Sequence, residues 1–189
     1  MTEDTAQQSL AQIMRALKFA AAKHRDQRRK DVQASPYINH PIALAVILAD
    51  EVGVTDTAVI CAALLHDTVE DTETTIDELV ERFGAEVASI VAEVTDDKTL
   101  PKSERKKQQI EHARTASEKA RLVKLADKIA NLRDIAASPP ADWDITRRQE
   151  YFDWAARVVD AMRGTHPKLE SLFDVAAQHR EQLKAPQPN

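Results

Sequence analysis

The sequence predicts an all-α protein that folds as one compact helical bundle. Glycine is scarce, with three in 189 residues, and the eight prolines lie mostly near the ends of the expected helices. Apolar residues make up 43% of the chain and recur at helical spacing, which gives the helices a shared core. No segment is a strong strand candidate. We therefore expect a single domain over residues 1–184 and a flexible tail over 185–189.

Apolar periodicity and capping residues define the helices of the N-terminal half. The first helix is expected over residues 5–24, and four apolar residues share one of its faces. They are Leu10, Ile13, Met14 and Leu17. Later helices follow potential N-caps, which are Asn39, Asp56 and Thr75. The expected ranges are 40–52, 57–71, 76–83 and 86–94.

The C-terminal half is predicted to hold three more helices. Residues 95–107 are polar and should begin as a loop, and the helices are expected over 117–136, 146–162 and 167–183. Helix 117–136 carries apolar residues at heptad-like spacing on one face. They are Leu122, Leu125, Ile129 and Leu132.

Charge and hydropathy exclude several classes of protein. The chain has 26 basic and 31 acidic residues, and this net charge of −5 gives no sign of nucleic-acid binding. The longest apolar run has eight residues, too few to span a bilayer, and the N-terminus does not resemble a signal peptide. Cys61 is the only cysteine, so no intramolecular disulfide can form. We expect a cytoplasmic protein without a membrane or nucleic-acid partner, and the sequence leaves its oligomeric state open.

One short segment gathers an unusual set of charged residues. In ALLHDTVEDT an apolar run ends at His66 and Asp67, and two more acids follow at Glu70 and Asp71. On a helix, at about 100° per residue, these four side chains occupy one arc of roughly 140°. Acids are disfavoured in the last turn of a helix and are costly to bury without a positive partner. A metal ion would be such a partner.

Two other segments supply further candidate ligands. Asp127, Asn131 and Asp134 form a polar stripe opposite the leucine face of helix 117–136. Alone, that stripe fits a solvated surface, and a histidine such as His40 at a helix start is more often structural or exposed than a ligand. Together the candidates form a mixed nitrogen and oxygen set that suits a divalent transition metal. This set is His40, His66, Asp67 and Asp127.

The order of these residues resembles the HD-domain metal-dependent phosphohydrolases, and HDTVED is the longer HDxxED version of the motif. Five segments are similar to the stand-alone small alarmone hydrolases, which are related to the hydrolase half of RelA/SpoT-type enzymes. They are PYINHP, AALLHDTVEDT, VTDDKTLPKSERK, LVKLADKIANLRD and EYFDWA. The resemblance covers about residues 19–165 and implies the helical HD fold, with its core at about 37–134.

The resemblance also implies an activity and residue roles. Such enzymes hydrolyse guanosine 3′,5′-bis(diphosphate) (ppGpp), the alarmone of the stringent response, to GDP and pyrophosphate. The implied cofactor is Mn²⁺, with the ligands His40, His66, Asp67 and Asp127. The implied catalytic pair, which acts on a water molecule, is Glu70 and Asp71. The implied substrate-binding residues are Arg29, Lys30, Asn131 and Tyr151.

Other cations and aromatics receive weaker assignments. Arg147 lies one turn before Tyr151 on the same face, so we add it to the substrate-binding residues. One or two members of a second basic cluster are expected to reach phosphate. That cluster is Lys98, Lys102, Arg105, Lys106 and Lys107. Trp143 and Trp154 are interpreted as packing residues.

Two rival functions remain open from the sequence. The same metal and carboxylates would serve another nucleotide phosphohydrolase, such as an NADPH 2′-phosphatase. A non-catalytic module that senses nucleotide would be expected to have lost a ligand or a catalytic carboxylate. All six of those positions are intact here, which favours an enzyme.

Overall fold

The structure is a computed structural model that describes residues 3–183. Within that range the chain forms helices around one core, and its only β-type pairing is two isolated bridges. The expected all-α bundle is thus confirmed. The predicted tail, 185–189, lies outside the described residues, as does residue 184. None of the described helices combines the length and apolar character needed to cross a membrane.

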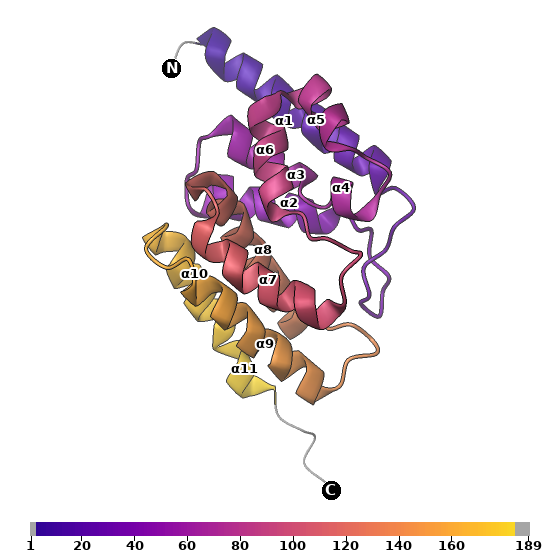
Figure 1. The fold of residues 1–189 in the computed structure, drawn as a ribbon, viewed down its shortest axis with the longest axis vertical. Coiled ribbons are helices and arrows are strands. Elements are labelled where there is room, and N and C mark those ends of the chain that lie inside the picture. The colour runs from indigo at the N-terminus through magenta and orange to yellow at the C-terminus, as the bar shows by residue number, and fades with distance from the viewer. Residues whose placement is uncertain (1–2, 184–189) are drawn as a thin grey trace, which may run out of the picture.

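Twelve helical elements make up the described chain (Figure 1). The N-terminal half contains α1 (Glu3–Lys23), α2 (Asn39–Val46), the π-helix η1 (Ile47–Glu51), α3 (Thr57–Leu65), α4 (Thr68–Asp71), α5 (Ile76–Phe83) and α6 (Ala85–Val94). The C-terminal half contains α7 (Lys102–Thr115), α8 (Glu118–Ala137), α9 (Ile145–Asp160), α10 (Pro167–Ala177) and α11 (His179–Gln182).

Side-chain caps start several helices where the sequence predicts. Oδ1 of Asp56 accepts the backbone N–H groups of Ala58 and Val59 at 2.9 and 3.2 Å, which begins α3. The Thr75 hydroxyl accepts the N–H of Glu78 at 3.1 Å and begins α5. Asn39 is different, because it already lies inside α2 and the preceding residue makes no side-chain cap.

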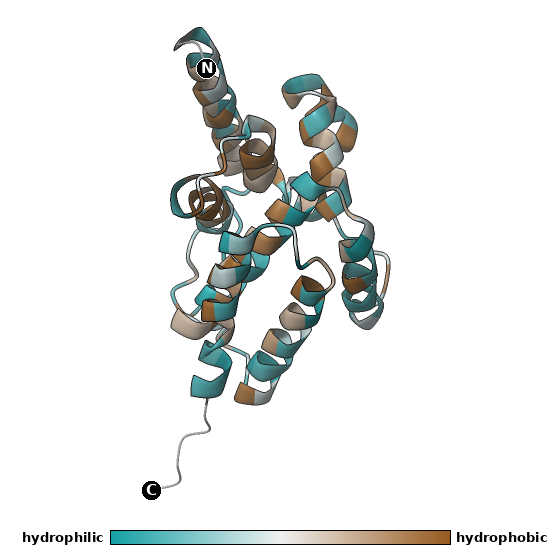
Figure 2. Ribbon diagram, turned by 90° about the vertical axis from the view of Figure 1, so that its left-hand side faces the viewer, coloured by the Kyte–Doolittle hydropathy of each residue, from teal (hydrophilic) through white to brown (hydrophobic). Residues whose placement is uncertain are grey.

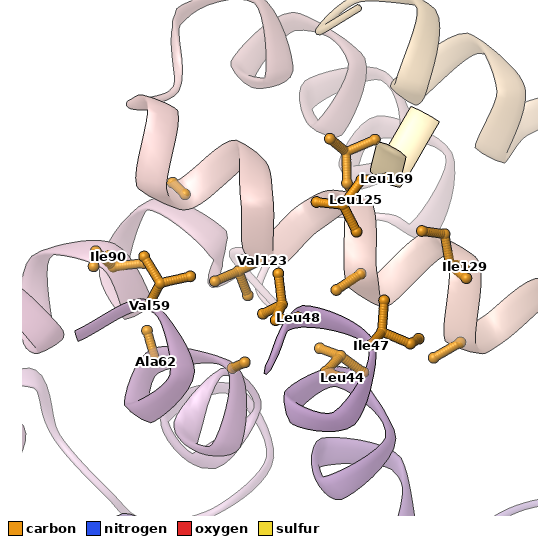
Figure 3. Packing of buried hydrophobic residues seen from close by; sticks show 14 of the residues in the cluster. Leu44, Ile47, Leu48, Val59, Ala62, Ile90, Val123, Leu125, Ile129 and Leu169 are labelled. Atoms are coloured by element: carbon orange, nitrogen blue, oxygen red, sulfur yellow. The ribbon is translucent and has the colours of Figure 1, made fainter. Parts of the chain in front are cut away.

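Helix α8 is the centre of the bundle. It contacts α2, η1, α3 and α6 on one side and α9, α10 and α11 on the other. Three of its four predicted core residues, Leu125, Ile129 and Leu132, are fully buried, and Leu122 is partly buried. Figure 3 shows side chains from α2, α3, α6 and α10 gathered around α8 in one continuous core. Burial of these apolar side chains supplies most of the drive for folding.

Three details differ from the sequence-based expectations. The helix expected over 57–71 is broken at His66 and Asp67, which separate α3 from α4. Residues 95–101 are a loop as expected, but no helix was predicted for the segment that forms α7. Leu10 and Met14 are 61% and 53% exposed, although periodicity placed them on a core face. The reason is visible in Figures 1 and 2, where the N-terminal end of α1 extends beyond its neighbouring helices.

Candidate functional site

The break between α3 and α4 fixes the direction of the His66 side chain. Nδ1 of His66 lies 2.9 Å from the carbonyl oxygen of Ala63, and the Thr68 hydroxyl donates to the carbonyl oxygen of Leu65 at 2.7 Å. These contacts satisfy carbonyls that the end of a helix leaves without partners. If Nδ1 donates its hydrogen to Ala63, Nε2 keeps its lone pair for another partner.

Nε2 of His66 is buried and has no hydrogen-bond partner among the described residues. It lies 2.8 Å from Oδ2 of Asp67, a charge contact without the angles of a hydrogen bond. Ligand atoms of His40, His66 and Asp67 all lie within 4.8 Å of one another. His66 therefore has the surroundings of a metal-binding histidine: one ring nitrogen is buried beside a carboxylate, and the other is held by a backbone carbonyl.

Asp127 approaches this group from α8 through His40, although it is not one of the three residues whose ligand atoms all lie within 4.8 Å. Its Oδ1 lies 3.2 Å from Nε2 of His40 and accepts a 2.6 Å hydrogen bond from the amide of Asn131. Its Oδ2 lies 2.8 Å from Nζ of Lys128. Burial lowers the pKa of His66, but Asp67 and then Asp127 outweigh it and raise that pKa to about 9. The two aspartates therefore favour a positive charge at His66, and a divalent cation bound there would be favoured for the same reason.

The four proposed metal ligands and the proposed catalytic pair line one small cavity, the carboxylate cavity, of about 220 Å³. Oε2 of Glu70 accepts the N–H of Asp96 at 3.2 Å, and Asp71 pairs with Lys98. Burial raises the pKa of Glu70 to about 7, and neighbouring carboxylates act in the same direction. A carboxyl group with this pKa can accept a proton from water near neutral pH.

A second cavity, the loop cavity, opens beside the first and has a volume of about 450 Å³. It is lined by Arg29, Lys30 and Asn131, three of the predicted substrate-binding residues. Nη2 of Arg29 donates to Asp134 at 2.6 Å, and its guanidinium carbon lies 5.8 Å from the centre of the Tyr37 ring. The Arg29 side chain is thus held in place before any ligand arrives.

A third cavity, the tryptophan cavity, has a volume of about 440 Å³. Its walls include Trp143 and Trp154, with Arg147 4.7 Å from the centre of the Trp143 ring. Of the second basic cluster, the members that line it are Lys102, Arg105 and Lys106. Tyr151 lines all three cavities, so the eleven predicted site residues surround one connected region.

The remaining members of the basic cluster lie elsewhere. Lys98 pairs with Asp71, as noted, and the exposed Lys107 pairs with Glu104 at 3.6 Å. Arg105 also approaches the proposed catalytic pair, because its Nη1 lies 3.8 Å from Oε1 of Glu70. The cluster therefore divides between the carboxylates and the tryptophan cavity.

Sequence reasoning missed several residues of the site. The Tyr37 hydroxyl donates to Oδ2 of Asp67 at 2.5 Å, and no local pattern distinguishes this tyrosine. Lys124 and Lys128 line the carboxylate cavity from α8. The sequence does indicate Lys124, because it lies three residues before Asp127 and therefore on the same helix face.

The sequence also matches known proteins. The family model described as "HD domain" matches residues 16–153. The chain belongs to the HD-domain family. Relatives of this HD domain include the human protein named guanosine-3′,5′-bis(diphosphate) 3′-pyrophosphohydrolase MESH1. It is 59% identical over 163 residues, which cover 86% of this chain and 91% of the relative. The expected resemblance to small HD-domain alarmone hydrolases is confirmed.

More distant relatives and solved structures agree. The Drosophila melanogaster MESH1 protein is 51% identical over 87% of this chain and 92% of its own length. An Aquifex aeolicus protein named guanosine-3′,5′-bis(diphosphate) 3′-pyrophosphohydrolase is 42% identical over 68% of this chain, but only 18% of its own length. A solved structure described as a metazoan ortholog of SpoT that hydrolyses ppGpp superposes with a TM-score of 0.87. It is 49% identical and covers 90% of this HD-domain chain and 96% of that one.

Proposed function

We propose that this chain hydrolyses ppGpp at its 3′-diphosphate and releases GDP and pyrophosphate. The observation that carries the proposal is the carboxylate cavity, where Glu70 and Asp71 adjoin a metal-ligand set of two histidines and two aspartates. The names of the relatives support the same substrate. HD domains are metal-dependent hydrolases, and we propose that His40, His66, Asp67 and Asp127 hold Mn²⁺. When bound, such an ion withdraws charge from phosphate oxygens and makes water more acidic.

The two acidic residues after the ligand pair would act on the attacking water. We assign Glu70 as general base, because its raised pKa suits proton transfer at neutral pH, and Asp71 as the residue that helps orient the water. In the reaction the water oxygen bonds to the phosphorus next to the ribose and gives a proton to Glu70. The bond from that phosphorus to the 3′-oxygen breaks, and the oxygen keeps the electron pair and takes up a proton.

The other two cavities would bind the rest of the nucleotide. Arg29 and Lys30 in the loop cavity would contact the nucleoside, since a guanidinium can stack on a base. Asn131 already donates to Asp127 and would lie next to the ribose. Arg147 and Tyr151 border the tryptophan cavity, whose lysines suit the second diphosphate.

One structural observation supports NADPH as the alternative substrate. The tryptophan cavity has the half-buried Trp143 in its lining, and a dinucleotide has a second base that could stack on this side chain. Removal of its 2′-phosphate would use the same carboxylate cavity. The sensing-module alternative gains no such support, since the described site retains both carboxylates beside the ligand set.

One assay separates these functions. Purified protein loaded with Mn²⁺ is incubated with ppGpp or with NADPH, and GDP, pyrophosphate and phosphate are quantified. We expect GDP and pyrophosphate in equal amounts, with kcat/KM higher for ppGpp. Metal-loaded protein that binds ppGpp without turnover would favour the sensing module. The cytoplasmic location, the lack of a nucleic-acid partner and the domain limits expected from the sequence remain predictions.

A further inference from the structure

Lys124 is a buried cation that makes no direct contact with an acidic side chain among the described residues. Its side chain lines the carboxylate cavity and the residue is only 7% exposed, yet it makes no hydrogen bond or ion pair with any described residue. The other two cations that line the cavity are both paired. Arg29 contacts Asp134 at 2.6 Å, and Lys128 contacts Asp127 at 2.8 Å.

Folding alone gives no reason for this arrangement. Burial, and next the positive charge of Lys128, lower the pKa of Lys124, and the more distant carboxylates of Asp96, Asp127 and Glu70 offset this only in part. An unpaired buried charge costs stability, and an apolar side chain of similar length would avoid that cost. Costs of this kind are typical of functional sites, where a ligand supplies the missing partner.

We propose that the Lys124 ammonium contacts the phosphate group that undergoes attack in the carboxylate cavity and is a further catalytic residue. This inference rests on the proposed function. Helix α8 presents Lys124 to the same cavity as Asp127 and Glu70. An ammonium is a compact charge with three donors, which suits the non-bridging oxygens of a phosphate.

The role is electrostatic. As the water oxygen bonds to phosphorus and the bond to the 3′-oxygen breaks, the non-bridging oxygens of the attacked phosphate keep their negative charge inside a cavity that also holds several carboxylates. Lys124 offsets that charge without giving or taking a proton. A donor fixed in advance at such a position is typically worth about 10²–10³-fold in kcat.

The test is a Lys124→Met variant, which keeps the length of the side chain and removes its charge. We expect kcat for ppGpp to fall by about 10²-fold, with Mn²⁺ content unchanged. We also expect the melting temperature of the metal-free variant to equal or exceed that of the unmodified protein. Lys107→Met is the matched control, because Lys107 lies on the surface and lines none of the three cavities.

Two results would overturn the proposal. One is a kcat within threefold of the unmodified protein. The other is a lower melting temperature with loss of Mn²⁺, which would make Lys124 a structural counter-ion of the cavity acids. If the Met variant does not fold, Lys124→Gln is measured in the same way and judged by the same criteria.

Inorganic pyrophosphate separates this inference from the proposed function. Calorimetric titration of the Mn²⁺-loaded proteins should show pyrophosphate binding at least tenfold weaker, as an order of magnitude, in Lys124→Met than in the Lys107→Met control. If the unmodified protein fails to hydrolyse ppGpp, the proposed substrate is wrong, but this difference would still support the phosphate contact. Equal binding by the two variants would rule the contact out.

Discussion

The hydroxyl of Tyr37 donates a 2.5 Å hydrogen bond to Oδ2 of Asp67. The Tyr37 ring is held by His24, whose ring centre lies 4.9 Å away, and by Arg29 at 5.8 Å. One tyrosine therefore connects the loop before α2 to a proposed metal ligand. Hydrogen bonds of this kind orient a carboxylate toward a metal ion and tune its affinity.

Replacement of Tyr37 by Phe should weaken Mn²⁺ binding while leaving the fold intact. The ring and its contacts remain, so only the hydrogen bond to Asp67 is lost. We expect a decrease of about 10-fold in Mn²⁺ affinity, the lower end of the usual range for such partners. Calorimetric titration of the metal-free variant with Mn²⁺ measures this affinity. An affinity equal to that of the unmodified protein would mean that the hydroxyl does not orient Asp67.

Replacement of His66 by Ala removes a proposed ligand outright. We expect the Mn²⁺ content of the purified variant to fall sharply, with helicity by circular dichroism nearly unchanged. His112→Ala is the control, since His112 is exposed and lines none of the three cavities. Full Mn²⁺ content together with full activity in His66→Ala would show that the ligand set is wrong.

The pKa of Glu70 predicts how activity depends on pH. Since burial raises this pKa to about 7 and a general base must be deprotonated, activity should be lost as the pH falls below about 7. With Mn²⁺ saturating, kcat should decrease about tenfold for each pH unit below that value and level off above it.

Glu70→Gln is the matching variant for the pH profile. It should keep Mn²⁺ and bind ppGpp, but its kcat should fall by about 10²–10⁴-fold and lose the pH dependence.

Asp71→Asn should behave similarly to Glu70→Gln. Because paired residues act as a unit, the double variant should be little worse than either single variant. A fully active, metal-loaded Glu70→Gln protein would leave this carboxylate without a catalytic role.

Lys30 should affect the binding of ppGpp more than its turnover. The side chain is exposed at the loop cavity, and its backbone oxygen accepts the N–H of Ala141 at 2.9 Å, a contact that alanine would keep. Lys30→Ala should raise KM about tenfold with kcat nearly unchanged, as expected when a ground-state contact to a charged group is lost. Steady-state kinetics with Lys107→Ala as control measures the difference. An unchanged KM would make Lys30 a solvated surface residue.

Local sequence was sufficient for most of the fold. Caps at Asp56 and Thr75 and the buried row of leucines on α8 all depend on neighbours within a few residues, so their pattern is readable. The break at His66 was not readable, because it depends on which side chains satisfy the carbonyls of Ala63 and Leu65. The exposure of Leu10 was missed for a related reason, since periodicity cannot show how far a helix extends past its neighbours.

The site divides in the same way. The pair at His66 and Asp67 could be found from its own segment. His40 and Asp127 were weak candidates when taken alone, because only the tertiary fold brings them within 3.2 Å of each other, and the resemblance strengthened their assignment. Tyr37 could not be found from spacing, since its partner lies on another element. The interpretation of the tryptophans as packing residues is confirmed, since Trp154 is buried in the core and Trp143 packs against it. Their additional placement along a cavity depends on how α9 lies against α7.

Helix α8 has a consequence for the design of inhibitors. From residue 119 to residue 136 its residues are buried or half-buried, because one face builds the core and another lines the cavities. A substitution there that weakened an inhibitor would also disturb packing or buried charge, each of which commonly costs about 1–3 kcal/mol of stability. Compounds that take their affinity from Asp127, Asn131 and Lys128 would therefore leave few tolerable routes to resistance. Compounds that depend on the exposed Lys30 would be escaped more easily.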